Sequence, residues 1–222
     1  MPKVAVVLSG CGFLDGAEIH EAVCTLLALD QYGADVLCCA PDIPQADVIN
    51  HMAQALLVGE SRNVLVESAR IARGQIRDLA EVSADEIDAV IFPGGFGAAK
   101  NLCTFATDGA ECQVNPEVTR LVQQMLQAGK PIGAICIAPA MIACILGQAG
   151  VKATLTIGRD KDTAAAIEAA GAQHRQCAAD DIVVDEPNKL VSTPAYMLAG
   201  GPAEVFAGVS KLVNRVLEFC ER

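Results

Sequence analysis

A single cysteine, Cys136, lies where a short apolar segment turns into the start of a helix. Residues 131–135 are apolar and lack helical periodicity, which predicts a buried strand. Pro139 is tolerated in the first turn of a helix, and the apolar run AMIACILG that follows predicts that helix. Ala134 and Ala138 provide the small flanking side chains that a nucleophile elbow requires. The pattern predicts a thiol on a sharp strand-to-helix turn.

A thiol at such a turn can act as a nucleophile. The N-terminus of a helix has unpaired N–H groups and a positive dipole end, which favour the thiolate and lower its pKa. We therefore expect Cys136 to be exposed and ionised, although free cysteines more often only pack in a core.

Attack on a carbonyl also requires N–H donors for the oxyanion that forms. Ile137 follows the cysteine directly and can supply one donor. Gly95 can supply another, because neither it nor Gly94 has a side chain to obstruct the approach. A turn that binds no ligand is the alternative interpretation of this glycine pair.

Glu18 is the candidate proton carrier. It opens a predicted helix after a glycine-rich loop, so it could instead be a first-turn carboxylate that complements the helix dipole. If it points at Cys136, burial would raise its pKa and let it shuttle protons. Asp15 is more typical of a turn. No histidine forms an evident pair with the cysteine, and we expect surface or packing roles for all three. They are His20, His51 and His174.

Strands and helices alternate along the chain and determine where these residues meet. The alternation predicts an α/β fold of three layers, a mostly parallel sheet with helices on both faces. Ligands bind at the carboxyl ends of the strands in such folds, so loops 9–18 and 93–97 and the elbow should converge there. The predicted strands are 3–8, 34–40, 89–92, 131–135 and 154–157, with a hairpin of 182–184 and 190–192. The predicted helices are 18–31, 116–128, 140–147, 163–170 and 202–220.

Two further expectations concern the first half of the chain. In the first helix we expect the larger apolar side chains to face the core. They are Ile19, Val23, Leu26, Leu27 and Leu29. We predict one domain, 1–222, with an insertion at 41–77 that is longer than a crossover needs. Within the insertion, the sequence of residues 63–74 predicts a hairpin or a strand plus turn. The insertion could act as a lid or a dimer contact.

Composition excludes several classes of protein. The net charge of -11 argues against nucleic acid or an anionic membrane as a partner, because both require a positive surface. No stretch approaches the roughly 20 apolar residues of a membrane span. Ten cysteines without a CxxC pair predict reduced, buried thiols and no metal site. The first ten residues lack signal or transit-peptide character, which predicts a cytoplasmic location.

Six longer motifs cover nearly the whole chain. They are LSGCGFLDGAEIHEAV (8–23), APD with DVINH (40–51), FPGGFGAAKNL (92–102), GAICIAPAM (133–141), LTIGRD (155–160) and DDIVVDEPNKLVSTPAYM (180–197). Together they resemble the Parkinson-associated deglycase and PfpI superfamily, and within it the ElbB subfamily, also called sigma cross-reacting or enhancing-lycopene-biosynthesis protein. The resemblance implies a homodimer and a flavodoxin-like fold shared with class I glutamine amidotransferase domains.

The resemblance also implies an activity and its residues. It makes Cys136 the nucleophile, Glu18 its protonating partner, and Gly95 and Ile137 the backbone donors. It implies a glyoxalase that uses neither cofactor nor glutathione and converts a small reactive carbonyl, glyoxal or methylglyoxal, to the 2-hydroxy acid. The thiolate would add to one aldehyde to form a hemithioacetal, Glu18 would relay a proton through an enediol, and water would release the product.

Other functions are predicted less strongly. A non-catalytic oxidative-stress sensor or regulatory binder, with Cys136 oxidised to sulfinate, is the main alternative. Peptidase activity is not expected, because Ile137 stands where the protease branches have His. Amidotransfer would require a late His and Glu pair that the chain lacks. Gly158 stands where some relatives have a further His, so the predicted dyad has no third member.

Overall fold

The first strand explains why the central sheet is buried on both faces. In the computed structural model, which describes residues 1–221, β1 (Lys3–Val7) directs Val4 and Val6 into one apolar cluster and Ala5 and Val7 into another. All four are fully buried. Because successive side chains of a strand point to opposite faces, each face of the sheet needs its own cover of helices.

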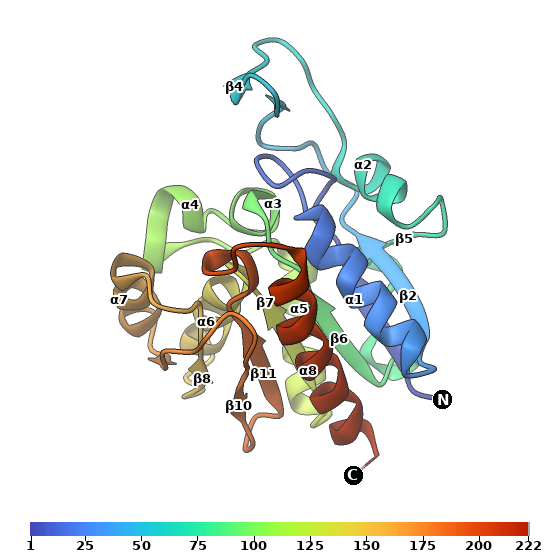
Figure 1. Ribbon diagram of the computed structural model, residues 1–222, viewed down its shortest axis with the longest axis vertical. Helices are drawn as coiled ribbons and strands as arrows, with labels where there is room; N and C mark the ends of the chain where they lie inside the picture. The colour runs from blue at the N-terminus through green and yellow to red at the C-terminus, as the bar shows by residue number, and fades with distance from the viewer. Residues whose placement is uncertain (222) are drawn as a thin grey trace.

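The central sheet has seven strands in the order β10-β11-β7-β6-β1-β2-β5 (Figure 1). Neighbouring strands are parallel, except for the antiparallel hairpin of β10 and β11. The remaining bounds are β2 Asp35–Ala40, β5 Arg77–Asp78, β6 Ala89–Phe92, β7 Ile132–Ile135, β10 Val183–Asp185 and β11 Leu190–Thr193. Two small separate sheets pair β3 (Ile49–Asn50) with β4 (Ala55–Leu56), and β8 (Thr154–Leu155) with β9 (Gln173–His174).

Helices complete the outer layers. On one face lie α1 (Ile19–Gln31) and α8 (Pro202–Cys220), side by side in Figure 1, and on the other α5 (Pro116–Gln127) and α6 (Ala138–Gln148). The shorter helices are α3 (Phe96–Lys100), α4 (Phe105–Asp108) and α7 (Lys161–Ala169). Single 3₁₀ turns span Leu79–Glu81, Ala84–Glu86, Gly109–Glu111 and Ala195–Met197. The predicted three-layer α/β fold is confirmed. No helix within residues 1–221 has the length and apolar character needed to cross a membrane.

The buried face of α1 differs from the prediction. Ile19, Val23 and Leu27 are 42%, 48% and 44% exposed. The buried residues are Glu21, Ala22, Thr25, Ala28 and Leu29. The prediction is confirmed for Leu29, and Leu26 is partly buried against the core, but it was wrong for Ile19, Val23 and Leu27, because most of this face uses small side chains that allow α1 to pack closely. The carboxyl group of Glu21 is buried on this same face.

The insertion also differs from the prediction. Residues 64–71 form helix α2 (Val64–Ile71) rather than a hairpin or strand, because the Asn63 side chain caps the Val66 N–H and Glu67 pairs with Arg70 one turn later. The β3–β4 hairpin projects from the body of the molecule (Figure 1). It is attached there by the Asp15 carboxylate, which accepts the Ile49 N–H at 2.8 Å.

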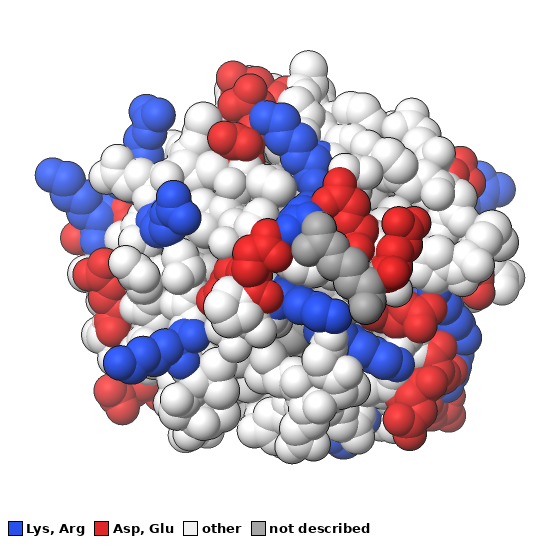
Figure 2. All heavy atoms as spheres, turned by 90° about the horizontal axis from the view of Figure 1, so that it is seen from below, with Lys and Arg blue, Asp and Glu red and all other residues white. Residues whose placement is uncertain are grey.

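The face seen from below mixes charges of both signs. Figure 2 shows Lys and Arg interspersed with Asp and Glu on this face rather than gathered into a basic stripe. Cations and carboxylates also form ion pairs, such as Arg77 with Glu86 and Arg215 with Glu218. The exclusion of a nucleic-acid partner stays a prediction that this distribution favours.

We expect Leu29→Ala to lower the free energy of unfolding by about 2–5 kcal/mol, because Leu29 is fully buried. Leu27→Ala, two residues earlier on the exposed side of the same helix, should cost less than about 1 kcal/mol. Urea unfolding of both variants measures the difference. Equal losses in the two variants would contradict the burial pattern of α1.

Candidate functional site

Cys136 occupies a strained turn between β7 and α6. Its φ angle is +62°, in the left-handed region that non-glycine residues adopt rarely and mostly at functional sites. Its N–H donates to the Thr193 carbonyl oxygen at 2.9 Å, which ties the turn to the end of β11. Ala134 and Ala138 on either side are fully buried. The predicted nucleophile elbow is confirmed.

The sulfur of Cys136 is buried, which contradicts the expected exposed thiolate. The residue is only 7% exposed, and burial raises the pKa of its thiol well above the ordinary value, with the charge of Glu21 as the next cause. The backbone N–H groups of Gly95 and Ile137 hydrogen-bond the sulfur and lower its pKa. The two donors therefore lie where the sequence placed them, but the loss of hydration outweighs their effect.

Glu21 is the carboxyl group that lies beside the thiol. It is fully buried on α1 and shares a hydrogen bond with the Cys136 side chain. Its Oε2 accepts the Gly94 N–H at 3.0 Å, and its Oε1 accepts the Tyr196 N–H at 3.2 Å. Burial first, and the negative charge of Glu18 second, raise the pKa of Glu21 to about 8, although these hydrogen bonds oppose the shift.

Glu18 does not occupy the position beside the Cys136 sulfur that the sequence predicted for it. It is the N-cap of α1, and its Oε2 accepts the Glu21 N–H at 2.7 Å. It also lines the cavity that Cys136 faces. The hydrogen bond to the sulfur that was expected of Glu18 is thus made by Glu21, one helical turn further on, while a proton-carrying role for Glu18 stays a prediction.

Gly94 permits this close approach. A Cβ atom at position 94 would lie 2.5 Å from the Cβ of Cys136 and 2.8 Å from Oε2 of Glu21. Both distances are shorter than side chains tolerate, so only glycine allows the loop after β6 to reach the elbow and α1 together. The glycine pair is therefore required by the site, and is not merely a surface turn.

A cavity of about 520 Å³ opens over the sulfur. Its walls are mainly apolar and aromatic, and none of its lining side chains is Lys or Arg. The lining residues come from the loop after β1, from α3, α4 and α7, from the elbow and from the turn after β11. They are Phe13, Glu18, Gly95, Phe96, Ala99, Phe105, Ala106, Cys136, Ile137, Thr163, Tyr196 and Met197.

The three histidines occupy three different places. His20 Nδ1 lies 2.7 Å from the Tyr196 hydroxyl, which brings one histidine to the edge of the cavity. His51, in the hairpin, accepts the Leu14 N–H at 3.3 Å and supports the loop after β1. His174 accepts the Ile157 N–H at 3.4 Å. The expected packing role holds for the last two, and His20 has a further contact that the sequence did not predict.

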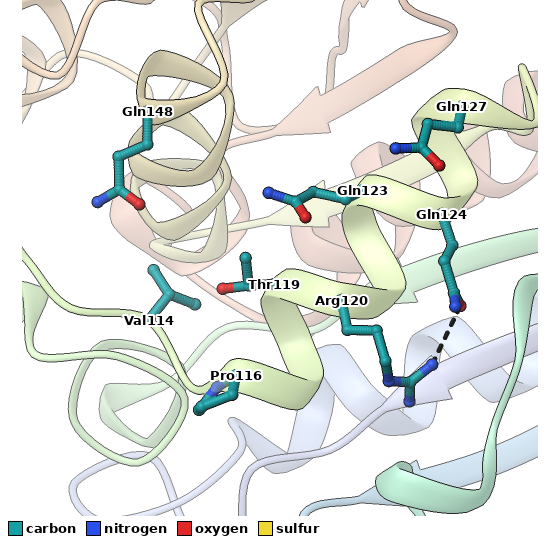
Figure 3. Close-up of a pocket in the computed structure, with 8 residues that line it drawn as sticks. All are labelled: Val114, Pro116, Thr119, Arg120, Gln123, Gln124, Gln127 and Gln148. Carbon is teal, nitrogen blue, oxygen red and sulfur yellow. Dashed lines mark hydrogen bonds between the residues drawn. The ribbon is translucent and has the colours of Figure 1, made fainter.

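A second hollow of about 500 Å³ lies between α5 and α6 and contains no nucleophile. Figure 3 shows amide side chains around it, with Gln148 of α6 across from Gln123 of α5. Arg120 on its rim is already bonded to Gln124, as the dashed line marks. The cavity over Cys136 is therefore the candidate site, because it contains a thiol and a carboxyl group and this second hollow contains neither.

Metal ligands and disulfides do not shape the site. Within residues 1–221, no group of three or more His, Cys, Asp or Glu side chains is arranged to hold a metal ion. All ten cysteines are free thiols. The chemistry available at the cavity is that of a thiol, carboxyl groups, a phenol and backbone N–H donors.

Sequence reasoning missed Glu21 and Tyr196. A signal for Glu21 was present, because Glu21 shares a face at helical spacing with Ala22, Thr25 and Ala28, all small residues. For Tyr196 there was no comparable signal, since its position depends on how the turn after β11 meets α1.

Fold and site together define an α/β protein of the class I glutamine amidotransferase-like type with a cysteine at its nucleophile elbow. The chain belongs to the DJ-1/PfpI family, whose model matches residues 11–195. This superfamily includes enzymes such as deglycases and proteases. The resemblance seen in the sequence motifs is confirmed.

Several relatives are similar over nearly the whole chain. The "isoprenoid biosynthesis protein with amidotransferase-like domain" of Ehrlichia chaffeensis superposes with a TM-score of 0.92 at 36% identity, covering 99% of both chains. The human "glutamine amidotransferase-like class 1 domain-containing protein 3, mitochondrial" is 50% identical over 97% of this chain and 82% of its own length. The zebrafish (Danio rerio) "ES1 protein, mitochondrial" is 35% identical over 97% of this chain and 85% of its own.

These names correct one prediction. The human and zebrafish relatives, and a similar protein of Rattus norvegicus, are each named as mitochondrial. The predicted cytoplasmic location is therefore wrong. It rested only on the character of the first ten residues, which is weak evidence for the compartment in which a protein works.

The raised pKa of Glu21 predicts a pH dependence of stability. Its value is about 8 in the fold against an ordinary 4.5, so between these limits the native state holds a proton that the unfolded chain has released. Stability must then fall as pH rises through this window. From about pH 6 to about pH 8, we expect the wild type to lose on the order of 2 kcal/mol more than Glu21→Gln, which cannot ionise.

Urea unfolding at a series of pH values tests this expectation. Asp30→Asn, which changes an exposed carboxylate near the other end of the same helix, is the matched control and should keep the wild-type pH dependence. Parallel stability curves for wild type and Glu21→Gln would show that Glu21 ionises normally in the fold.

Proposed function

We propose that the protein is a glyoxalase that needs neither cofactor nor glutathione and converts glyoxal, or methylglyoxal, to the 2-hydroxy acid. The observation that carries the proposal is the hydrogen bond between Cys136, which lines a cavity, and Glu21, which is buried behind it, with the N–H groups of Gly95 and Ile137 on the sulfur. A nucleophile, a base and two oxyanion donors are the parts that addition to a carbonyl requires.

In the first stage, the Glu21 carboxylate removes the thiol proton as the sulfur of Cys136 attacks one aldehyde carbon. The carbonyl electrons move to oxygen, where the two backbone N–H groups stabilise the charge. Glu21 then returns the proton to this oxygen. The product is a hemithioacetal, and Glu21 is again a carboxylate.

In the second stage, Glu21 takes the C–H proton of the hemithioacetal carbon. The electron pair forms the C=C bond of an enediol, and the second carbonyl oxygen gains a proton. Glu21 then returns its proton to the second carbon while the hydroxyl of the first carbon loses its proton, which gives a thioester. Water hydrolyses the thioester to free Cys136 and the hydroxy acid. One carbon is oxidised and its neighbour reduced, so the only co-reactant is water.

The cavity supports a small, uncharged substrate. Its walls contain no Lys or Arg, so they offer no partner for the carboxylates of glutathione or for a phosphorylated sugar. About 520 Å³ accommodates glyoxal or methylglyoxal with room to spare.

The alternative function, a cysteine-based oxidation sensor, receives less support. Peroxide reacts with exposed thiolates of low pKa, whereas Cys136 is buried and the pKa of its thiol is raised. The homodimer implied by the resemblance stays a prediction. The exposed apolar side chains of α1 and of the projecting hairpin, such as Val23 and Met52, are where a second copy could bind.

Glycolate formation from glyoxal without glutathione tests the proposal. We expect Cys136→Ser to reduce it to background and Glu21→Gln to lower kcat/KM by about 100-fold or more, because both lose the attacking pair. Glu18→Gln should lose less, and Cys220→Ser, the same type of change at the far end of α8, should behave as wild type. No wild-type glycolate above background, with Cys136 oxidised by mild peroxide, would favour the sensor instead.

The pH dependence of the reaction follows from the base. Only the carboxylate form of Glu21 accepts the thiol proton, and its pKa is about 8. We therefore expect kcat/KM to rise about tenfold per pH unit below this value and to level off above it. Initial rates of glycolate formation across the pH range measure this. A rate that is flat from pH 5 to pH 8 would exclude Glu21 as the base.

A further inference from the structure

Tyr196 is held at the cavity by two contacts with α1. Its hydroxyl lies 2.7 Å from His20 Nδ1, and its backbone N–H donates to Oε1 of Glu21 at 3.2 Å. The two rings are 5.7 Å apart between centroids and tilted by 44°. Tyr196 lines the same cavity as Cys136, whereas His20 is exposed. Tyr196 thus contacts the buried pair through its backbone N–H and the exposed His20 through its hydroxyl.

The proposed reaction leaves one proton transfer without a named residue. When the enediol forms, the second carbonyl oxygen must gain a proton while Glu21 is occupied with the proton from carbon. Four lining residues carry a side-chain group able to exchange a proton: Glu18, Cys136, Thr163 and Tyr196. Cys136 is bonded to the substrate at this point, and a threonine hydroxyl is a poor acid. Glu18 already accepts the Glu21 N–H and its negative charge would repel a developing oxyanion.

We propose that Tyr196 is a further catalytic residue, which donates its hydroxyl proton to the second carbonyl oxygen of the bound dialdehyde, and that His20 positions it. This inference rests on the proposed glyoxalase function. His20 acts through Tyr196 and does not touch the substrate. With the proton on Nδ1, the imidazole donates to the phenol oxygen and leaves the phenol O–H free for the substrate.

Tyr196 both gives and regains a proton during the enediol step. Tyr196 loses its proton to the second oxygen as the C–H bond breaks, and the resulting phenolate is stabilised by His20. In a cis-enediol the two oxygens are neighbours, so the same phenolate can take the hydroxyl proton of the first carbon when the thioester carbonyl forms. Tyr196 is then restored, with no oxidant, reductant or further reactant.

The surroundings keep the phenol protonated before reaction. Burial first, and the charge of Glu18 second, raise the pKa of Tyr196 above its ordinary value. A protonated phenol is a hydrogen-bond donor to a carbonyl oxygen, which is the role required at the start of the enediol step.

The test compares the only two tyrosines of the chain. We expect Tyr196→Phe to lower kcat for glycolate formation from glyoxal by about 100-fold with little change in KM, because one proton donor is lost. Tyr32→Phe removes the same hydroxyl at the end of α1, where it contacts Ser210 rather than the cavity, and should behave as wild type. Wild-type kcat in Tyr196→Phe would overturn the inference while leaving the glyoxalase intact.

His20 is tested by rescue. His20→Asn keeps a polar group near the position of Nδ1 and should retain kcat within a few fold, whereas His20→Leu should resemble Tyr196→Phe. Equal activity of His20→Leu and wild type would remove His20 from the proposal.

A second readout follows the first stage alone. Glyoxal should protect Cys136 from iodoacetamide equally in wild type and Tyr196→Phe, as measured by mass spectrometry of the Cys136 peptide, because adduct formation does not need the phenol. Loss of protection in Tyr196→Phe would contradict a role confined to the enediol step. Failure of the wild type to make glycolate is a separate result, which would overturn the proposed function and this inference together.

Discussion

The contact between two buried acids, the thiol of Cys136 and the carboxyl of Glu21, is the constraint on which the site depends. Each group loses water on burial, and the charge that acts most strongly on each is negative, from Glu21 on the thiol and from Glu18 on the carboxyl. Both pKa values are raised, so near neutrality the pair keeps its protons. Reactivity must then come from the fraction of molecules in which Glu21 is ionised and can take the thiol proton, rather than from a thiolate that exists in advance.

The rest of the site can be understood as support for this contact. The positive φ of Cys136 directs the thiol towards α1, and Gly94 leaves room for sulfur and carboxyl to meet. The backbone N–H groups on the sulfur and on both carboxyl oxygens provide polar partners that a buried pair needs. These partners come from the ends of β6, β7 and β11, three neighbouring strands. The parallel sheet brings them to one edge.

The sequence predicted the fold and the nucleophile because their signals are local. Short apolar runs, a proline in a first helical turn and small residues around Cys136 each act within a few positions, and the strand Ala89–Phe92 and the helix Pro202–Cys220 match the predicted bounds. The thiol partner could not be chosen in this way. Glu18 and Glu21 are one turn apart, and which of them is buried depends on how the loops after β6, β7 and β11 meet α1.

Burial of the thiol was unpredictable for the same reason. A helix N-terminus predicts a lowered pKa, but how much water reaches the sulfur depends on loops from three other elements. Likewise, the run of 63–74 favours strand locally and becomes helix α2 because Asn63 caps it and Val64 and Ser68 are buried one turn apart. Tertiary burial, not local pattern, accounts for these differences.

The most direct test of the buried pair is a ¹³C NMR titration of the glutamate side-chain carboxyl carbons, with Glu21 assigned by its absence in Glu21→Gln. We expect the Glu21 resonance to titrate near pH 8, and Cys136→Ser to change this titration because the hydrogen-bond partner is altered. A Glu21 carboxyl that titrates near its ordinary value of 4.5, and whose titration is the same in Cys136→Ser, would contradict the buried pair.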